Sequence, residues 1–141
     1  MFVETAGWGV VSGRRATNLA GERILVAEDE FFIADDIRAA LVGSGAEVLG
    51  PVPTCAEALA VMSREDRIDG AVLDIHLGDG LAFPIADALA ERGVPFIFAT
   101  GYDEAIVPDR FRTVPRWEKP FDLSKVVDAL QQVVGPRRIE S

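Results

Sequence analysis

The chain has 141 residues, of which 49% are hydrophobic and 26% charged, as expected of one globular domain with a buried core. Its net charge of −9 argues against non-specific binding to nucleic acid or to an anionic membrane, because both need a basic surface. Its one cysteine, Cys55, excludes an internal disulfide framework and fits a reducing compartment.

The sequence contains no signal for a membrane or for export. No apolar run approaches the roughly 18 residues that a membrane span requires. Near the N-terminus, Arg14 and Arg15 follow the mildly apolar stretch, whereas the basic residues of a signal peptide precede it. We therefore expect a cytoplasmic protein.

Residues 1–22 are rich in Gly, Ala and Thr without helical or strand periodicity, which predicts a flexible N-terminal extension. A single domain is expected over residues 23–134, followed by a C-terminal tail at 135–141 and no output domain. Five apolar runs of strand length are expected within the domain: "RILVAE", "AEVLGP", "DGAVLDI", "VPFIFAT" and "VPRWEK".

Segments with helical patterns separate these runs. Thr54 and Glu57 form the sequence pattern of a capping box at the start of one helix, and Asp122 is expected to cap the last helix. Between residues 101 and 113, Pro108 and the lack of an apolar stripe predict a fourth helix that is short, irregular or mobile. The alternation of strands and helices predicts an α/β fold with a doubly wound, five-stranded parallel sheet.

Polar residues stand where the expected strands end. Glu28 and Asp29 (with Glu30 next) follow the first strand, Asp74 the third, Thr100 the fourth and Lys119 the fifth. These residues should converge, because the carboxyl ends of parallel strands share one edge. Clustered carboxylates need a cation or protons, and oxygen ligands without a His/Cys set favour Mg²⁺ over zinc. A lysine and a hydroxyl beside such a metal suit a phosphoryl group.

Four short motifs carry a resemblance to a known family. In this order and spacing they resemble the CheY-like receiver domain of bacterial two-component response regulators, over residues 22–134: "ILVAEDE", "VLDIHLGDG", "FATGY" and "EKPF". The combination of "FATGY" and "KPF" is similar to the FAT-GUY subgroup, whose members are commonly single-domain proteins. The resemblance implies a flavodoxin-like sheet with the strand order 2-1-3-4-5.

The resemblance also implies the roles of individual residues. Asp74 would accept a phosphoryl group, Thr100 would hydrogen-bond to that group, and Lys119 would pair with it. Pro120 is expected to follow a cis peptide bond.

A Mg²⁺ site is implied by the same resemblance. Asp29 and Asp74 would bind the ion directly, together with the backbone carbonyl of His76, and Glu28 would act through metal-bound water. The imidazole of His76 is expected either to be solvated or to modulate the lifetime of the phosphate.

The function implied is that of a single-domain response regulator, not an enzyme beyond its own phosphotransfer and dephosphorylation. Its partners would be a sensor histidine kinase or a histidine phosphotransfer protein and a downstream protein target. The alternatives are a phosphate sink or relay component, a contact-only receiver without phosphate, and a Mg²⁺-dependent phosphatase that forms an aspartyl-phosphate. The phosphatase is disfavoured because "DIHLG" lacks the second aspartate of the DxDx[TV] motif and lies on the third strand. A DNA-binding regulator is disfavoured because no helix-turn-helix is expected after residue 134.

Signal output is where the sequence departs from the family. The position that usually holds a switch aromatic is Arg116, and strand alternation points the adjacent Trp117 to the opposite face. Tyr102 is therefore expected to couple the phosphate to the segment after it. Phe31 and Phe32, beside the acids, are expected either to be half-buried packing residues or to contact a partner protein.

Overall fold

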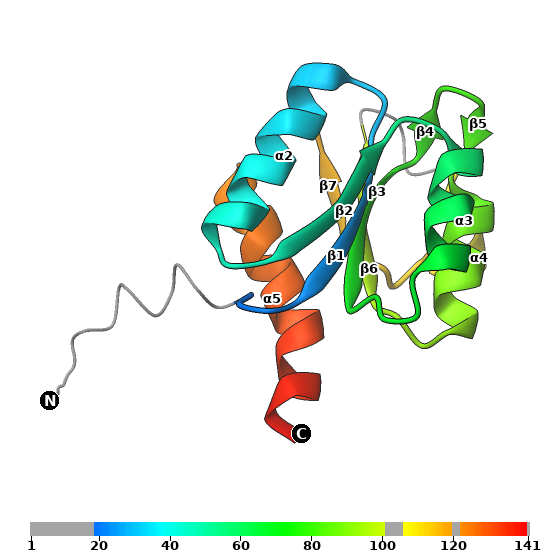
Figure 1. The fold of residues 1–141 in the computed structure, drawn as a ribbon. Coiled ribbons are helices and arrows are strands. Elements are labelled where there is room, and N and C mark those ends of the chain that lie inside the picture. The colour runs from blue at the N-terminus through cyan, green and yellow to red at the C-terminus, as the bar shows by residue number, and fades with distance from the viewer. Residues whose placement is uncertain (1–18, 101–105, 120–121, 141) are drawn as a thin grey trace, which may run out of the picture.

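A computed structural model of the chain describes residues 19–100, 106–119 and 122–140, and the side chains of Thr100 and of residues 135–140 fall outside this description. Strands and helices alternate along it (Figure 1). The five main strands are β1 (Arg23–Ala27), β2 (Glu47–Val52), β3 (Gly70–Asp74), β6 (Phe96–Thr100) and β7 (Arg116–Glu118). They coincide with the five apolar runs expected from the sequence.

These strands form one parallel sheet in the spatial order β2-β1-β3-β6-β7. Numbered among themselves along the chain, their order is 2-1-3-4-5, which confirms the doubly wound, flavodoxin-like sheet. The register places Ala27 of β1 beside Leu73 of β3, and Asp74 beside Ala99 of β6. The residues immediately after β1 therefore leave the sheet next to Asp74.

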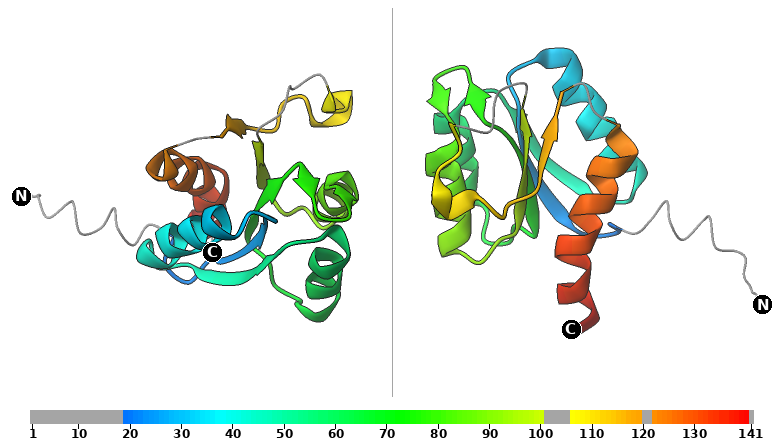
Figure 2. Two further views of the ribbon diagram at one scale, coloured as in Figure 1. Left: turned by 90° about the horizontal axis from the view of Figure 1, so that it is seen from above. Right: turned by 180° about the vertical axis from the view of Figure 1, so that it is seen from behind.

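Helices cover both faces of the sheet. They are α2 (Phe31–Gly43), α3 (Cys55–Arg64), α4 (Phe83–Glu91) and α5 (Leu123–Glu140). Figure 1 and the view from above in Figure 2 show α2 and α5 on one face and α3 and α4 on the other. Alternate strand residues supply the two cores, because successive side chains of a strand point to opposite faces. Ile24 and Val26 belong to the core under α2 and α5, whereas Leu25 and Ala27 belong to the core under α3 and α4.

The predicted helix starts are confirmed. The hydroxyl of Thr54 accepts a hydrogen bond from the backbone N–H of Glu57 at 3.1 Å, and this hydroxyl also lies 3.2 Å from the Glu57 carboxylate. Asp122 accepts the backbone N–H of Ser124 at 3.0 Å at the start of α5. These bonds satisfy backbone donors that have no partner within the first turn of a helix.

The folded part of the chain begins earlier than the sequence indicated. Leu19 is 1% exposed in the core under α2 and α5, and its N–H donates to the carbonyl of Ser44 at 3.0 Å. Glu22 is buried as well. Residues 19–22 thus belong to the domain, not to the extension predicted over 1–22, whose residues 1–18 lie outside the described residues. A single leucine in a Gly/Ala-rich stretch has no periodicity that could have revealed its burial.

The folded part also ends later than expected. Helix α5 continues to Glu140, so residues 135–140 extend this helix instead of forming a separate tail. The apolar stripe that predicted the helix ends at Val134, and periodicity places the end of a helix only to within a few residues.

The expected irregular segment before β7 contains a short 3₁₀ turn, η2 (Asp109–Phe111), within its described residues 106–115. Phe111 is 4% exposed, and its ring lies 5.9 Å from those of Phe83, Phe96 and Phe98. Arg110 donates two hydrogen bonds to Asp87 of α4, at 2.8 and 2.9 Å. A buried ring and a bidentate ion pair therefore anchor this part of the segment.

Candidate functional site at the carboxyl edge of the sheet

Three carboxylates meet where β1 and β3 end. Glu28 and Asp74 are buried, at 3% and 4% exposure, while Asp29 faces solvent. One oxygen from each of these residues lies within 4.8 Å of the others. The convergence predicted from the strand ends is confirmed, because β1 and β3 are neighbours in the sheet. Buried carboxylates this close together require compensation by positive charge.

Lys119 provides positive charge at this cluster. Its Nζ lies 2.9 Å from Asp74 Oδ2, 3.0 and 3.1 Å from the two carboxylate oxygens of Glu28, and 3.0 Å from Glu30 Oε1. Burial lowers the pKa of Lys119, but its hydrogen bonds to Asp74, Glu28 and Glu30 outweigh burial and raise the pKa above its ordinary value. The lysine therefore stays charged and holds the ends of β1, β3 and β7 together.

The Glu28 carboxyl is the most perturbed acid of the cluster. The pKa of Glu28 is raised to about 7, mainly by burial and in addition by the nearby Asp74. Hydrogen bonds from the backbone N–H of Glu30, at 3.0 Å, and from Lys119 lower this pKa but only in part. One lysine thus leaves the negative charge of the cluster incompletely balanced, and a divalent cation would favour the ionised form of Glu28.

A hairpin that the sequence analysis did not predict comes directly after Asp74. It pairs β4 (His76–Leu77) with β5 (Gly80–Leu81) in antiparallel orientation. Ala82 donates its N–H to the carbonyl of Ile75 at 2.9 Å, so the next pair along the ladder, His76 with Leu81, is a non-hydrogen-bonded pair. The N–H and C=O of His76 therefore point away from β5, and its N–H donates to Asp74 Oδ1 at 3.1 Å. The carbonyl of His76 lies on that same side, as a metal ligand beside Asp74 requires.

Asp79 in the turn of this hairpin was missed as a structural residue. Its carboxylate accepts the backbone N–H groups of Cys55 at 2.7 Å and Ala56 at 3.0 Å, the first two residues of α3. These two bonds lower the pKa of Asp79. The N–H of Gly78 also donates to the carbonyl of Pro53 at 3.1 Å. The hairpin is thereby fixed to the start of α3. The only sequence signal was the Gly-Asp-Gly pattern, which indicated a turn.

Several predicted residues fall partly or wholly outside the description. Thr100 ends β6, opposite Glu118 of β7, but its hydroxyl is not among the described atoms. Tyr102 and Pro120 lie outside the described residues, so their roles stay predictions. Trp117 packs against the core under α2 and α5. Strand alternation therefore directs Arg116 toward the other face, as expected.

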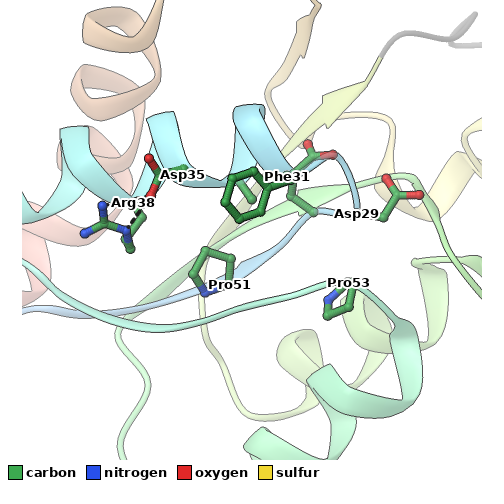
Figure 3. A pocket seen from close by; sticks show the side chains of 8 residues that line it. Asp29, Phe31, Asp35, Arg38, Pro51 and Pro53 are labelled. Carbon is green, nitrogen blue, oxygen red and sulfur yellow. Dashed lines mark hydrogen bonds and ion pairs between the residues drawn. The ribbon is translucent and has the colours of Figure 1, made fainter.

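Phe31 and Phe32 are solvent-exposed aromatics beside the acids. They are 74% and 79% exposed, and their rings meet edge to face at 5.4 Å. Of the two expectations for this pair, half-buried packing is therefore excluded. Figure 3 shows Phe31 above Pro51 in a pocket that extends from the acidic cluster along the start of α2. The residues lining this pocket are Glu28, Asp29, Phe31, Ala34, Asp35, Arg38, Pro51 and Pro53.

Comparisons with known proteins agree with this geometry. The chain is 40% identical to SdrG of Pseudomonas melonis in its BeF₃-activated conformation, over 82% of this chain and 98% of SdrG, with a TM-score of 0.66. It is 27% identical to a response regulator receiver protein of Sinorhizobium medicae, over 84% of this chain and 98% of that one, with a TM-score of 0.72. The chain belongs to the CheY-like response regulator receiver family. No protein-family model matches it.

The receiver is also 35% identical over 116 residues to the phyllosphere-induced regulator PhyR of Methylorubrum extorquens, covering 81% of this chain and 42% of PhyR. It spans less than half the length of the curated relatives that it matches. Among the described helices, none combines the length and the apolar character needed to cross a membrane. The family assignment and the geometry together identify the Glu28, Asp29 and Asp74 cluster as a place that could hold a metal ion.

Proposed function

We propose that this receiver accepts a phosphoryl group on Asp74 from the phosphohistidine of a sensor histidine kinase or a histidine phosphotransfer protein. One observation carries the proposal. The Asp74 carboxylate is held between Lys119 Nζ at 2.9 Å and the His76 N–H at 3.1 Å, with an oxygen of Asp29 and one of Glu28 close by. This arrangement aims a nucleophile, a cation and a metal-binding set at the same small volume.

Each residue of the site would have its own part in the transfer. An oxygen of Asp74 forms a bond to phosphorus while the bond from phosphorus to the histidine nitrogen breaks, so the phosphoryl group moves without net oxidation or reduction. Lys119 balances negative charge on the phosphoryl oxygens, and the N–H of His76 orients the carboxylate. Thr100, at the end of β6, is proposed to donate its hydroxyl to the same oxygens.

Mg²⁺ is proposed as the metal. Asp29, Asp74 and the backbone carbonyl of His76 would hold it, with Glu28 acting through a metal-bound water, and all of these donors are hard oxygens. The raised pKa of Glu28 supports this assignment, because the buried carboxyl lacks a full complement of positive charge. When bound, Mg²⁺ would neutralise charge on the transferring phosphoryl group.

Signalling would proceed through contacts with other proteins in the cytoplasm, without catalysis of any other reaction. Phe31 and Phe32 are proposed as partner contacts, since large exposed aromatics beside a reactive site are typical of protein interfaces. The FAT-GUY assignment belongs to this proposal, as does coupling through Tyr102. A role as phosphate sink or relay component uses the same chemistry and differs only in the fate of the phosphoryl group after its transfer to Asp74.

The decisive experiment uses Mg²⁺ with beryllofluoride, a phosphoryl mimic. Binding to the folded state alone stabilises it by about 2.7 kcal/mol at a hundredfold excess over the dissociation constant. The melting temperature should rise in the wild type and in Asp66→Asn, which removes one exposed carboxylate at the other edge of the sheet. It should stay constant in Asp74→Asn. An equal rise in Asp74→Asn would overturn the assignment of Asp74.

A further inference from the structure

The hydrogen-bond donors of Lys119 are fully used. An ammonium group has three N–H donors. The Nζ of Lys119 donates to Asp74 Oδ2 at 2.9 Å, to Glu28 Oε2 at 3.1 Å and to Glu30 Oε1 at 3.0 Å. A phosphoryl group on Asp74 can therefore accept a hydrogen bond from Lys119 only if one of these three carboxylates releases the Lys119 N–H that it accepts.

The three acceptors differ in how easily they can leave. The side chains of Glu28 and Asp74 are 1% and 5% exposed, whereas that of Glu30 is 59% exposed. Separating a buried carboxylate from its cation is costly, while an exposed one is rehydrated at once. Glu30 is thus the acceptor that a phosphoryl oxygen can displace.

The position of Glu30 at the start of α2 supports this assignment. Its backbone N–H donates to Glu28 Oε2 at 3.0 Å, and its carbonyl accepts the N–H of Ala34 at 2.8 Å, so its main chain is held in place. It is the N-cap residue of α2, yet its side chain makes no capping hydrogen bond and reaches Lys119 instead. The side chain is therefore the movable part of an otherwise fixed residue.

We infer that Glu30 is a resting-state competitor for Lys119. Its carboxylate accepts the Lys119 N–H that a phosphoryl group on Asp74 would need, and this competition weakens the affinity of the site for that group. When the phosphoryl group leaves, the Glu30 carboxylate forms its ion pair with Lys119 again. This inference rests on the proposed function and deepens it, because it assigns to Glu30 the setting of phosphoryl affinity. Glu30 acts through Lys119 and is a positioning residue.

The expected effect is modest and measurable. A partly exposed ion pair contributes up to about 1 kcal/mol. Since about 1.4 kcal/mol corresponds to a tenfold change in affinity, loss of the Glu30 contact should tighten binding of the mimic by about two- to fivefold.

The test measures the affinity for beryllofluoride at saturating Mg²⁺, by titration with thermal or fluorescence detection, in the wild type and three variants. Glu30→Gln removes the charge. Glu30→Asp keeps the charge but shortens the side chain by one methylene, so that it falls short of Lys119. Asp35→Asn is the matched control, because it removes a charge one turn later on α2 from a carboxylate that pairs with Arg38.

Both Glu30 variants should bind beryllofluoride about two- to fivefold more tightly and release it more slowly, while Asp35→Asn matches the wild type. The Mg²⁺ affinity of Glu30→Asp should equal that of the wild type, a result that a general structural change would not give. If only Glu30→Gln binds more tightly, charge alone is responsible and competition by contact is wrong. If both variants match the wild type, the inference is also wrong. A wild type that fails to bind beryllofluoride would instead overturn the proposed function.

Discussion

Both edges of the sheet carry charged side chains, but the described arginines of the amino edge are distributed over several ion pairs, whereas acids of the carboxyl edge meet at one lysine. At the amino edge, Arg23 pairs with Glu65 at 2.7 Å and Arg67 with Asp69 at 2.9 Å. Arg92 donates to backbone carbonyls near the end of α3, including that of Met62 at 2.8 Å. At the carboxyl edge, Lys119 alone among the described basic residues faces the carboxylates of Glu28, Glu30 and Asp74.

This difference separates structure from function. The arginines of the amino edge donate to backbone carbonyls at a helix end and pair with the exposed or partly exposed acids Glu47, Glu65 and Asp69, which are contributions that stability alone explains. An excess of buried carboxylates lowers stability, and proteins usually keep such an excess only at a site that binds a ligand or carries out a reaction. The comparison predicts that changes at the amino edge alter stability without altering ligand binding, and that changes to the acids of the carboxyl edge alter ligand binding and stability together.

The largest effect is expected at the amino edge, for Leu19→Ala. Removing a fully buried leucine side chain from a core costs about 3 kcal/mol. Urea denaturation should show this loss, whereas the stabilisation by Mg²⁺ and beryllofluoride should be unchanged. A variant that lacks residues 1–17 should keep the stability of the full chain. If Leu19→Ala is as stable as the wild type, residues 19–22 belong to the extension after all.

An effect of about 2–3 kcal/mol between pH 5 and pH 8 is expected at the carboxyl edge, from the titration of Glu28. Its pKa is raised from 4.5 to about 7, so between these values the folded chain keeps a proton that the unfolded chain has released. Because the folded chain binds this proton more tightly, protonation of Glu28 stabilises the fold. The contribution is complete below pH 4.5 and is lost as the pH rises through about 7. The groups that face Glu28 include Asp29, Asp74 and Lys119, and the lysine stays charged throughout this range.

Unfolding free energies at pH 5 and pH 8, without metal, measure this contribution. The wild type should lose more stability over that interval than Glu28→Gln, which cannot titrate. Saturating Mg²⁺ should reduce the loss, because the ion favours the ionised carboxylate. Identical pH profiles for the two proteins would mean that Glu28 does not carry the perturbed pKa.

Much of the site could be predicted from the sequence because it depends on strand ends. Each of Glu28, Asp74 and Lys119 stands at the end of a recognisable apolar run, and parallel pairing brings such positions to one edge without further information. The start of α3 was predictable for a similar reason, since Thr54 and Glu57 are three residues apart and interact within one helical turn.

The contacts that were missed join residues far apart in the chain. Asp79 reaches Cys55 across 24 positions, and Arg110 reaches Asp87 across 23. The side chain of Leu19 is buried because the end of α2, which is distant in the sequence, packs against it. Periodicity and capping patterns are local signals, so none of them specifies which distant backbone a lone aspartate or leucine will meet.

The smallest effects should separate two residues that cap the same helix. Thr54→Ala removes the capping hydroxyl and its two hydrogen bonds with Glu57 at the start of α3 and should cost about 1 kcal/mol, leaving Mg²⁺ binding unchanged. Asp79→Ala also uncaps α3, but it frees the hairpin that carries His76, so it should lower the melting temperature and weaken Mg²⁺ affinity severalfold as well. Titration of Mg²⁺ against both variants decides the point. Equal Mg²⁺ affinities would make Asp79 a cap and nothing more, and would leave the position of the His76 carbonyl to the short β4–β5 ladder alone.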